Sequence, residues 1–184
     1  MGYGILVIDL QNEYFPGGHL ELVNIQEVAA KAKRLMDAGR EASVPVFHIR
    51  HIQPDPDSPI FQHGTQWIEI HESVKPEEGE TVITKHFPNS FRASKLGEVL
   101  KEKGIDKVIV CGAMSDVCVD ATVRAAADLG YECVVAQDAC TTRNIPYQDK
   151  TIAAGDAHGV IMTALGMFYA QVVDTDQAIS MIQE

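Results

Sequence analysis

Three residues that could work together in catalysis follow short apolar runs of the kind that form buried strands: Asp9, Lys85 and Cys118. A free thiol has a pKa of about 8.5 and is mostly protonated at neutral pH. A nearby ammonium and a helix N-terminus would both favour its thiolate. A carboxylate can take the thiol proton and pass it to a leaving amine, while backbone N–H groups at a helix start can hold an oxyanion. These residue types together therefore predict acyl transfer through a thioester.

Each of the three residues also has an ordinary structural interpretation. Asp9 could cap a turn, and Lys85 could be the solvated end of a strand. Cys118 could be a small buried hydrophobic residue. The catalytic interpretation therefore depends on elements that bring the three side chains to one place.

Strand-like and helix-like segments alternate along the chain. Strands are expected at 5–8, 45–49, 81–84, 108–110, 133–136 and 168–173. Helices are expected at 24–39, with Asn24 and Glu27 as a capping box, at 94–104, 117–129 and about 147–165, and at the C-terminal end. This alternation predicts an α/β fold in which helices cover both faces of a parallel sheet. Ligands bind at the carboxyl ends of the strands in such sheets, where the three reactive residues would lie.

One irregular stretch, 53–80, is rich in proline and interrupts this alternation. A long loop in a compact domain is often a lid or a binding loop, although a plain surface excursion is equally open. Its aromatic residues Phe61 and Trp67 could cover a substrate or pin the loop to the body or to a neighbouring subunit. Phe91, which follows Lys85 closely, could form a wall of the pocket or pack in the core. Trp67 and Phe91 are therefore candidate substrate-binding residues.

Length and composition limit the function classes. A chain of 184 residues is expected to form one domain over 1–184. The net charge of −11 argues against binding to nucleic acid, and no apolar run approaches the ~20 residues of a membrane span. The start of the chain has no basic segment typical of a signal peptide, and its four cysteines form no CxxC pair. We therefore expect a cytoplasmic protein with reduced thiols that acts on a small molecule.

Three motifs carry a resemblance to a known family. They are IDLQNEYFPGG at 8–18, TKHFPNSF at 84–91 and GAMSDVCV at 112–119, and the similarity continues through 121–126 and 138–139. In this order they resemble the isochorismatase-like cysteine hydrolases, which include nicotinamidases, carbamoylsarcosine and biuret amidohydrolases, and isochorismatase. The resemblance covers essentially the whole chain. It implies a three-layer α/β/α, Rossmann-like fold with a six-stranded parallel sheet in the order 3-2-1-4-5-6.

The resemblance also implies roles for individual residues. Cys118 would be the nucleophile, Asp9 the proton shuttle and Lys85 the cation that stabilises the thiolate and positions Asp9. A cis peptide bond would join Ala113 to Met114, and the N–H groups of Met114 and Cys118 would form the oxyanion hole. Tyr14 would line the pocket. Many members are homodimers or homotetramers in which a neighbour closes the site, so a homo-oligomer is expected.

Two departures from the patterns of individual family members limit the reactions that this chain is expected to catalyse. Nicotinamidases carry a metal site that begins Asp-x-His after the second strand, whereas this chain has His48-Ile49-Arg50-His51 there. We therefore expect no metal and no cofactor. Isochorismatases proper generally lack the cysteine, so Cys118 favours hydrolysis of a carboxamide or ureido C–N bond. Two alternatives remain: vinyl-ether hydrolysis with Asp9 as general acid, and a non-catalytic binding or scaffold protein.

Overall fold

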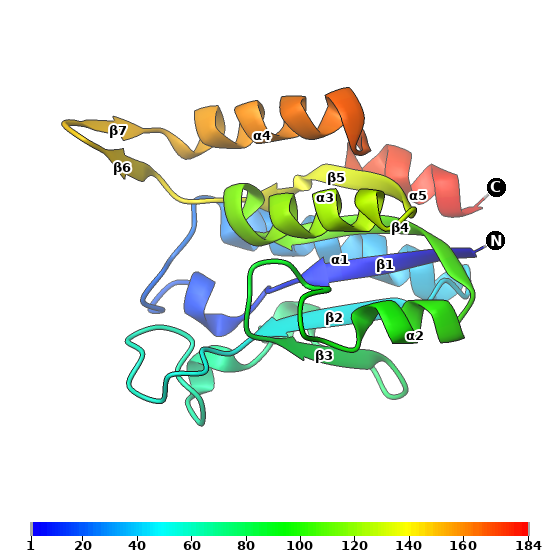
Figure 1. The fold of residues 1–184 in the computed structure, drawn as a ribbon, viewed down its shortest axis with the longest axis horizontal. Coiled ribbons are helices and arrows are strands. Elements are labelled where there is room, and N and C mark those ends of the chain that lie inside the picture. The colour runs from blue at the N-terminus through cyan, green and yellow to red at the C-terminus, as the bar shows by residue number, and fades with distance from the viewer. Residues whose placement is uncertain (1, 184) are drawn as a thin grey trace.

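The computed structural model describes residues 2–183, and its centre is a six-stranded parallel sheet (Figure 1). The strands are β1 (Gly2–Ile8), β2 (Val46–His51), β3 (Thr81–Lys85), β4 (Ile105–Ala113), β5 (Glu132–Thr141) and β8 (Gln171–Val173). Their order across the sheet is β3-β2-β1-β4-β5-β8, and every neighbouring pair is parallel. The predicted fold class and strand order are confirmed, since β8 is the sixth strand of this sheet along the chain.

Helices cover both faces of the sheet. They are α1 (Ile25–Glu41), α2 (Leu96–Glu102), α3 (Asp120–Asp128), α4 (Ala154–Phe168) and α5 (Thr175–Gln183). Side chains of α1 and α5 share one apolar core with Ile5 and Val7, whereas α2, α3 and α4 share a second core with Leu6 and Ile8. Successive side chains of a strand point to opposite faces, so the continuous apolar run of β1 supplies both cores.

The largest departure from the sequence prediction lies between β5 and β8. A helix was expected from about 147, but Ile145–Tyr147 (β6) and Lys150–Ile152 (β7) form a separate antiparallel hairpin. The helix α4 begins only at Ala154, whose backbone N–H donates to Oδ1 of Asn144 at 2.9 Å. This helix extends through Phe168, so β8 starts at Gln171 rather than at 168. The shift arises because cross-strand pairing overrides the helical pattern of the residues before Ala154.

The starts of two other helices also differ. Asn24 precedes α1 as expected, but its backbone is left-handed, with φ 55°, and its side chain makes no capping bond. The predicted capping box is therefore wrong. The helix expected at 117–129 is divided into a π-helical turn, Ser115–Val119, and the regular helix α3. This division determines the position of Cys118, one of the three candidate catalytic residues, because Cys118 lies in the π-helical turn.

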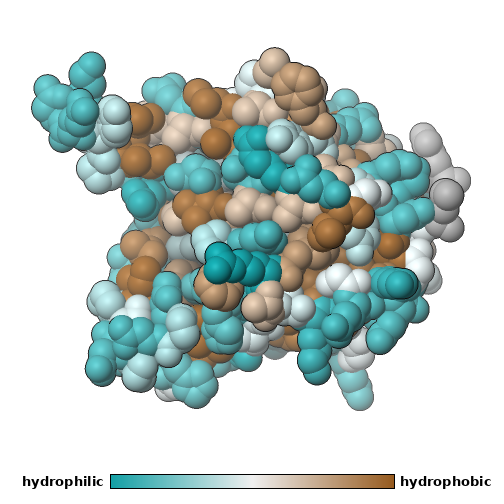
Figure 2. Space-filling model, viewed as in Figure 1, coloured by the Kyte–Doolittle hydropathy of each residue, from teal (hydrophilic) through white to brown (hydrophobic). Residues whose placement is uncertain are grey.

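The three most exposed large apolar side chains among residues 2–183 lie on α4. Val160, Met167 and Phe168 of this helix are 67%, 65% and 82% exposed. Figure 2 shows apolar residues along the upper edge of the molecule, where Figure 1 places α4. Over residues 2–183, none of the helices combines the length and apolar character needed to cross a membrane.

Candidate active site

The structure brings Asp9, Lys85 and Cys118 together at the carboxyl end of the sheet. Asp9 follows β1, Lys85 ends β3, and Cys118 belongs to the turn after β4. Nζ of Lys85 lies 2.7 Å from Oδ2 of Asp9 and 3.2 Å from Sγ of Cys118. Asp9 and Lys85 are fully buried, and Cys118 is 5% exposed. One ammonium therefore contacts both the carboxylate and the thiol in a setting where water screens little.

A sharp backbone turn positions Asp9. Its φ of 51° lies in the left-handed region, which Asp adopts more readily than most residues. Its N–H donates to the carbonyl of Ile49 at 3.0 Å, and its own carbonyl accepts from the N–H of Gln11 at 2.8 Å. The chain thus leaves the sheet abruptly, with the Asp9 carboxylate beside the end of β3.

The turn that carries Cys118 is anchored on both sides. The peptide bond between Ala113 and Met114 is cis, the geometry that the family resemblance implies. The carbonyl of Met114 then accepts from the N–H groups of both Val117 and Val119 at 3.1 Å. Further out, Oγ of Ser115 lies 2.8 Å from Nδ1 of His158, and Oγ1 of Thr142 donates to Asp116 at 2.5 Å. These bonds tie the turn to α4 and to the end of β5.

Close backbone packing next to this turn requires Gly112. A Cβ at this position would lie 2.1 Å from the carbonyl oxygen of Ile8, and its φ of 120° is strained for other residues. Ile8 directly precedes Asp9, so this contact sets β4 against the strand end that carries the carboxylate.

The electrostatics of Cys118 differ from the sequence expectation of a favoured thiolate. Burial raises the pKa of Cys118 and the charge of Asp9 raises it further, and together they outweigh the lowering effect of Lys85. Burial alone would lower the pKa of Lys85, but Asp9 and Cys118 raise it above its ordinary value. The resting site therefore holds a Lys85 ammonium and a Cys118 thiol, with Asp9 paired to the ammonium.

A cavity of about 180 Å³ opens beside Cys118. Its lining combines Tyr14, His51, Gln53, His86 and Cys118 with six apolar side chains: Leu20, Ile60, Phe61, Pro88, Met114 and Val117. The rings of Tyr14 and His51 each meet the edge or face of Phe61, at centroid distances of 5.2 and 5.1 Å. Such a small, mostly apolar cavity with a few polar groups fits a small molecule.

The loop 53–80 contributes to this cavity from the same chain through Gln53, Ile60 and Phe61. Trp67, in contrast, is half-buried against the ring of His19, with centroids 5.2 Å apart, and does not line the cavity. Phe91 packs against Tyr131, with centroids 5.7 Å apart, and also lies outside the lining. The structure therefore brings Tyr14 of the three expected substrate-binding residues to the cavity, and places the other two elsewhere.

His51 and Gln11 belong to the site although they were not predicted from the sequence. His51 pairs with Lys85 in the β2–β3 register, and its Nδ1 lies 3.3 Å from Nζ of Lys85. Burial and the charge of Lys85 lower the pKa of His51 to about 4. The buried side chain of Gln11 bonds to the backbone N–H and carbonyl of His51 and to the carbonyl of Ile68, each at 2.8 Å. Gln11 lies within the motif at 8–18, which was the available signal.

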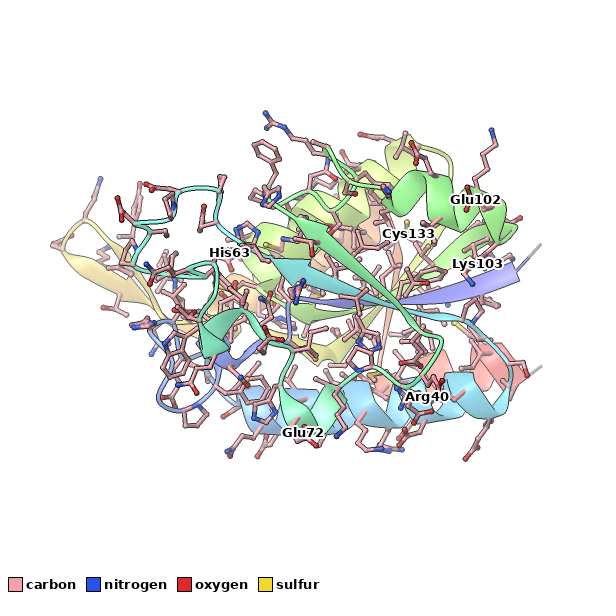
Figure 3. The ribbon with its side chains drawn as sticks, turned by 90° about the horizontal axis from the view of Figure 1, so that it is seen from below. Arg40, His63, Glu72, Glu102, Lys103 and Cys133 are labelled. Atoms are coloured by element: carbon pink, nitrogen blue, oxygen red, sulfur yellow. The ribbon has the colours of Figure 1, made fainter. Side chains whose placement is uncertain are left out.

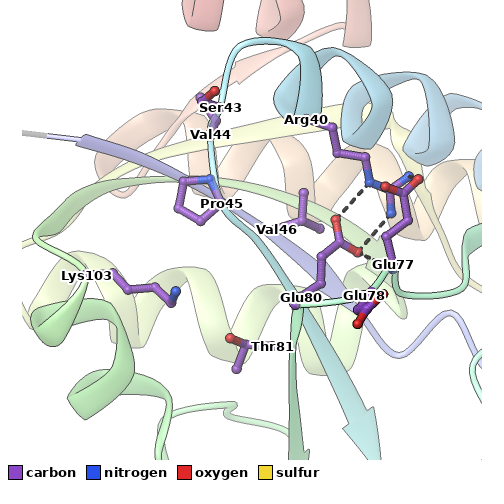
Figure 4. A pocket seen from close by; sticks show the side chains of 11 residues that line it. Arg40, Ser43, Val44, Pro45, Val46, Glu77, Glu78, Glu80, Thr81 and Lys103 are labelled. Carbon is purple, nitrogen blue, oxygen red and sulfur yellow. Dashed lines mark hydrogen bonds and ion pairs between the residues drawn. The ribbon is translucent and has the colours of Figure 1, made fainter.

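The other histidine of β2, His48, points away from this site. Its Nε2 lies 2.9 Å from Oε2 of Glu80, and the two oxygens of Glu80 also accept from Arg40 at 2.8 and 2.9 Å. Arg40 and Glu80 line a larger hollow, of about 330 Å³, at the amino ends of β2 and β3 (Figure 4). Within residues 2–183, no three His, Cys, Asp or Glu side chains are grouped so that they could hold a metal ion.

The chain is similar to several known proteins over most of its length. The family model described as the Isochorismatase domain matches residues 3–165. The isochorismatase family protein YddQ of Bacillus subtilis is 44% identical, over 96% of this chain and 98% of its own length. A crystal structure from Oleispira antarctica, described as an isochorismatase hydrolase, has 40% identity and a TM-score of 0.93, and the match covers 97% of this chain and 96% of that one. Nicotinamidase 3 of Arabidopsis thaliana is 27% identical, over 94% of this chain and 85% of its own length.

Proposed function

The chain belongs to the isochorismatase family of hydrolases, and we propose that it hydrolyses a small carboxamide or ureido C–N bond through a thioester on Cys118. The observation that carries this proposal is the placement of the Lys85 ammonium, 2.7 Å from Asp9 and 3.2 Å from Cys118 beside the cavity. A nucleophile and its base held by a third group is the arrangement on which covalent catalysis depends. The similarity to a nicotinamidase supports the choice of an amide bond.

In the first half of the reaction, Sγ of Cys118 attacks the substrate carbonyl carbon while the thiol proton moves to Asp9. The new oxyanion accepts hydrogen bonds from the backbone N–H groups of Met114 and Cys118. The C–N bond then breaks, and the proton on Asp9 passes to the leaving nitrogen, which departs as ammonia or an amine. The acyl group remains on Cys118 as a thioester.

In the second half, Asp9 takes a proton from water and the resulting hydroxide attacks the thioester carbonyl. The C–S bond breaks, and the proton on Asp9 returns to the sulfur as the acid product leaves. Lys85 keeps its charge throughout, because its raised pKa holds the proton. The raised pKa of Cys118 means that the thiol loses its proton during the attack rather than before it.

The test is ammonia release from a panel of small amides and ureido compounds, which includes nicotinamide and biuret. Wild type is compared with Cys118→Ala and with the control Cys133→Ala, which removes a buried thiol of β5 outside the cavity lining (Figure 3). We expect wild type and Cys133→Ala to release ammonia and Cys118→Ala to lose this activity.

Full activity in Cys118→Ala would overturn the proposed nucleophile. Isochorismate is assayed separately by its product, because vinyl-ether hydrolysis with Asp9 as general acid would survive the loss of the thiol. If wild type hydrolysed none of these compounds, the non-catalytic alternative would gain support.

A further inference from the structure

We propose that His51 and His86 form a donor and acceptor pair that selects an uncharged substrate with a second carboxamide or ureido group, an inference that rests on the proposed function. Both rings line the cavity beside Cys118. They belong to neighbouring strand ends, since His51 ends β2 and His86 directly follows β3. The ring nitrogen that carries the proton decides what each histidine offers a ligand.

The contact with Lys85 determines the proton position on His51. An ammonium has three donors and no lone pair, so Nδ1 of His51, 3.3 Å from Nζ of Lys85, must accept. Burial and Lys85 lower the pKa of His51 to about 4, so the ring is neutral at pH 7. A neutral ring that accepts at Nδ1 carries its proton on Nε2. His51 therefore offers the substrate an N–H donor.

His86 has the opposite arrangement. Its Nδ1 lies 2.7 Å from the carbonyl oxygen of Ile52, which can only accept, so the proton is on Nδ1. In the neutral ring, Nε2 is then an acceptor. The N–H of Ile52 donates to the carbonyl of Lys85 at 3.0 Å, which ties the two strand ends together. His86 therefore offers an acceptor in the same cavity as the donor of His51.

Both nitrogens are free to meet a ligand, because Nε2 of neither ring has a hydrogen-bond partner among residues 2–183. A carboxamide or ureido group presents a carbonyl acceptor and an N–H donor side by side. It would satisfy both histidines at once, whereas an alkyl group would leave them unpaired at a cost in binding. The pair is thus complementary to a polar group other than the bond that Cys118 attacks.

The charge of the cavity selects against an acid at this position. The lining contains no lysine, arginine, aspartate or glutamate side chain among residues 2–183. The nearby Lys85 ammonium is already paired with Asp9. A substrate carboxylate would lose its hydration without gaining an unpaired cation of this chain. Uncharged diamides and ureides are therefore favoured over amidic acids.

The test uses sets of probes with the same shape. Malonamide, succinamide and glutaramide vary the distance between the two amides. Isovaleramide, 4-methylpentanamide and 5-methylhexanamide replace one amide by an isopropyl group, and malonamic, succinamic and glutaramic acids replace it by a carboxylate. For at least one spacer length, we expect kcat/KM for the diamide to be about tenfold higher than kcat/KM for either isostere. One or two additional hydrogen bonds would give a difference of this size. Cys118→Ala should bind the same diamide about tenfold more tightly than its isosteres, as measured by calorimetry.

The variant His86→Leu tests the assigned acceptor. In this variant, the ratio of kcat/KM for the diamide to that for its isopropyl isostere should fall to about one. The ratio of the two binding affinities, measured in the Cys118→Ala background, should fall to about one as well. The matched control is His63→Leu, which removes a histidine of the 53–80 loop that does not line the cavity (Figure 3). This control should keep the preference of wild type.

The outcomes separate the two proposals. Amide hydrolysis with no preference for the diamide in turnover or binding would overturn the histidine pair and leave the reaction standing. No hydrolysis by wild type, with diamide-selective binding that His86→Leu removes, would support the pair and overturn the reaction. A preference that survives in His86→Leu would also overturn the pair.

Discussion

Lys85 and Asp9 form an ion pair, with 2.7 Å between Nζ and Oδ2, in which both side chains are fully buried. Burial of two charges is costly, and their attraction offsets that cost only when the geometry is close. Such a pair is therefore weak evidence for stability by itself. The position of the pair beside Cys118 is a better reason for its burial, because Asp9 raises the pKa of the thiol and Lys85 lowers it.

Removing the charge of Asp9 should make Cys118 more reactive while it stops catalysis. The Asp9 carboxylate raises the pKa of Cys118 and Lys85 lowers it, so Asp9→Asn leaves only the lowering charge. We expect the pH at which iodoacetamide labelling of Cys118 reaches half its maximal rate to fall by about one unit or more. Peptide mass spectrometry follows labelling, and amide hydrolysis should be lost in the same variant.

The control for this measurement is Asp128→Asn, which neutralises an exposed carboxylate at the end of α3, outside the turn that carries Cys118. It should label at the rate of wild type. The buried thiols of Cys133 and Cys140, with pKa raised to about 11 and about 12, are internal standards that should label slowly throughout. Slower labelling of Cys118 in Asp9→Asn would contradict the assigned electrostatics.

Breaking the ion pair from the other side should destabilise the fold. Lys85→Met leaves the carboxylate of Asp9 buried without its cation, which we expect to lower the free energy of unfolding by about 3 to 5 kcal/mol. Adding Asp9→Asn should recover part of the loss, with a coupling of at least about 1 kcal/mol in a double-mutant cycle. Urea denaturation measures all four proteins.

An exposed pair provides the comparison. Lys33 and Asp37 contact each other at 2.5 Å with half of the lysine side chain exposed. Lys33→Met should change the free energy of unfolding by about 0.5 kcal/mol or less. Equal losses at Lys33 and Lys85 would show that burial does not set the energetics of the Asp9–Lys85 pair.

The cluster around Glu80 should make stability depend on acid pH (Figure 4). Burial alone would raise the pKa of Glu80, but bonds from Arg40, the Glu77 backbone and His48 lower it from 4.5 to about 2. Stability from this carboxylate is therefore present above pH 4.5 and is lost as the pH falls toward 2. Glu80→Gln should lower the free energy of unfolding by about 1 to 3 kcal/mol at pH 7, and the difference from wild type should narrow below pH 4.5.

Thermal and urea unfolding between pH 3 and pH 7 would measure this dependence. Glu78→Gln is the matched control, because Glu78 lines the same hollow and is exposed. This control should follow wild type at every pH. A constant difference between Glu80→Gln and wild type across the range would contradict the assigned pKa.

Two glycine substitutions should have opposite effects. Gly112→Ala places a Cβ 2.1 Å from the Ile8 carbonyl, so the variant should lose several kcal/mol of stability or fail to fold. Gly159 lies inside α4, and no neighbouring atom comes within 4 Å of the place that an alanine methyl would take there. Gly159→Ala should therefore be stabilised by up to about 1 kcal/mol through helix propensity. Thermal melting compares the two, and a tolerated Gly112→Ala would disprove the close packing of β1 and β4.

Much of the architecture could be predicted from the sequence because its signals are local. The apolar run of β1 identifies a strand buried on both faces, and the alternation with helical segments determines a parallel sheet. Parallel strands end at one edge, so Asp9 and Lys85 had to lie near each other once the strand order was right. The hairpin of β6 and β7 was not predicted because its strands are stabilised by pairing with each other across a turn. The residues that follow the hairpin are helical, so the predicted helix was extended too far toward the N-terminus.

The chemistry of the site was only partly local. The residue types at the strand ends were sufficient to identify a thiol, a carboxylate and an ammonium as partners. The direction of the Cys118 pKa, the tautomers of His51 and His86, and the positions of Trp67 and Phe91 were decided by the tertiary structure. Burial and charge interactions depend on distance through space, and Lys85, Cys118 and Asp9 are separated by tens of residues along the chain. The sequence therefore determined which groups meet, and the folded structure determined where their protons reside.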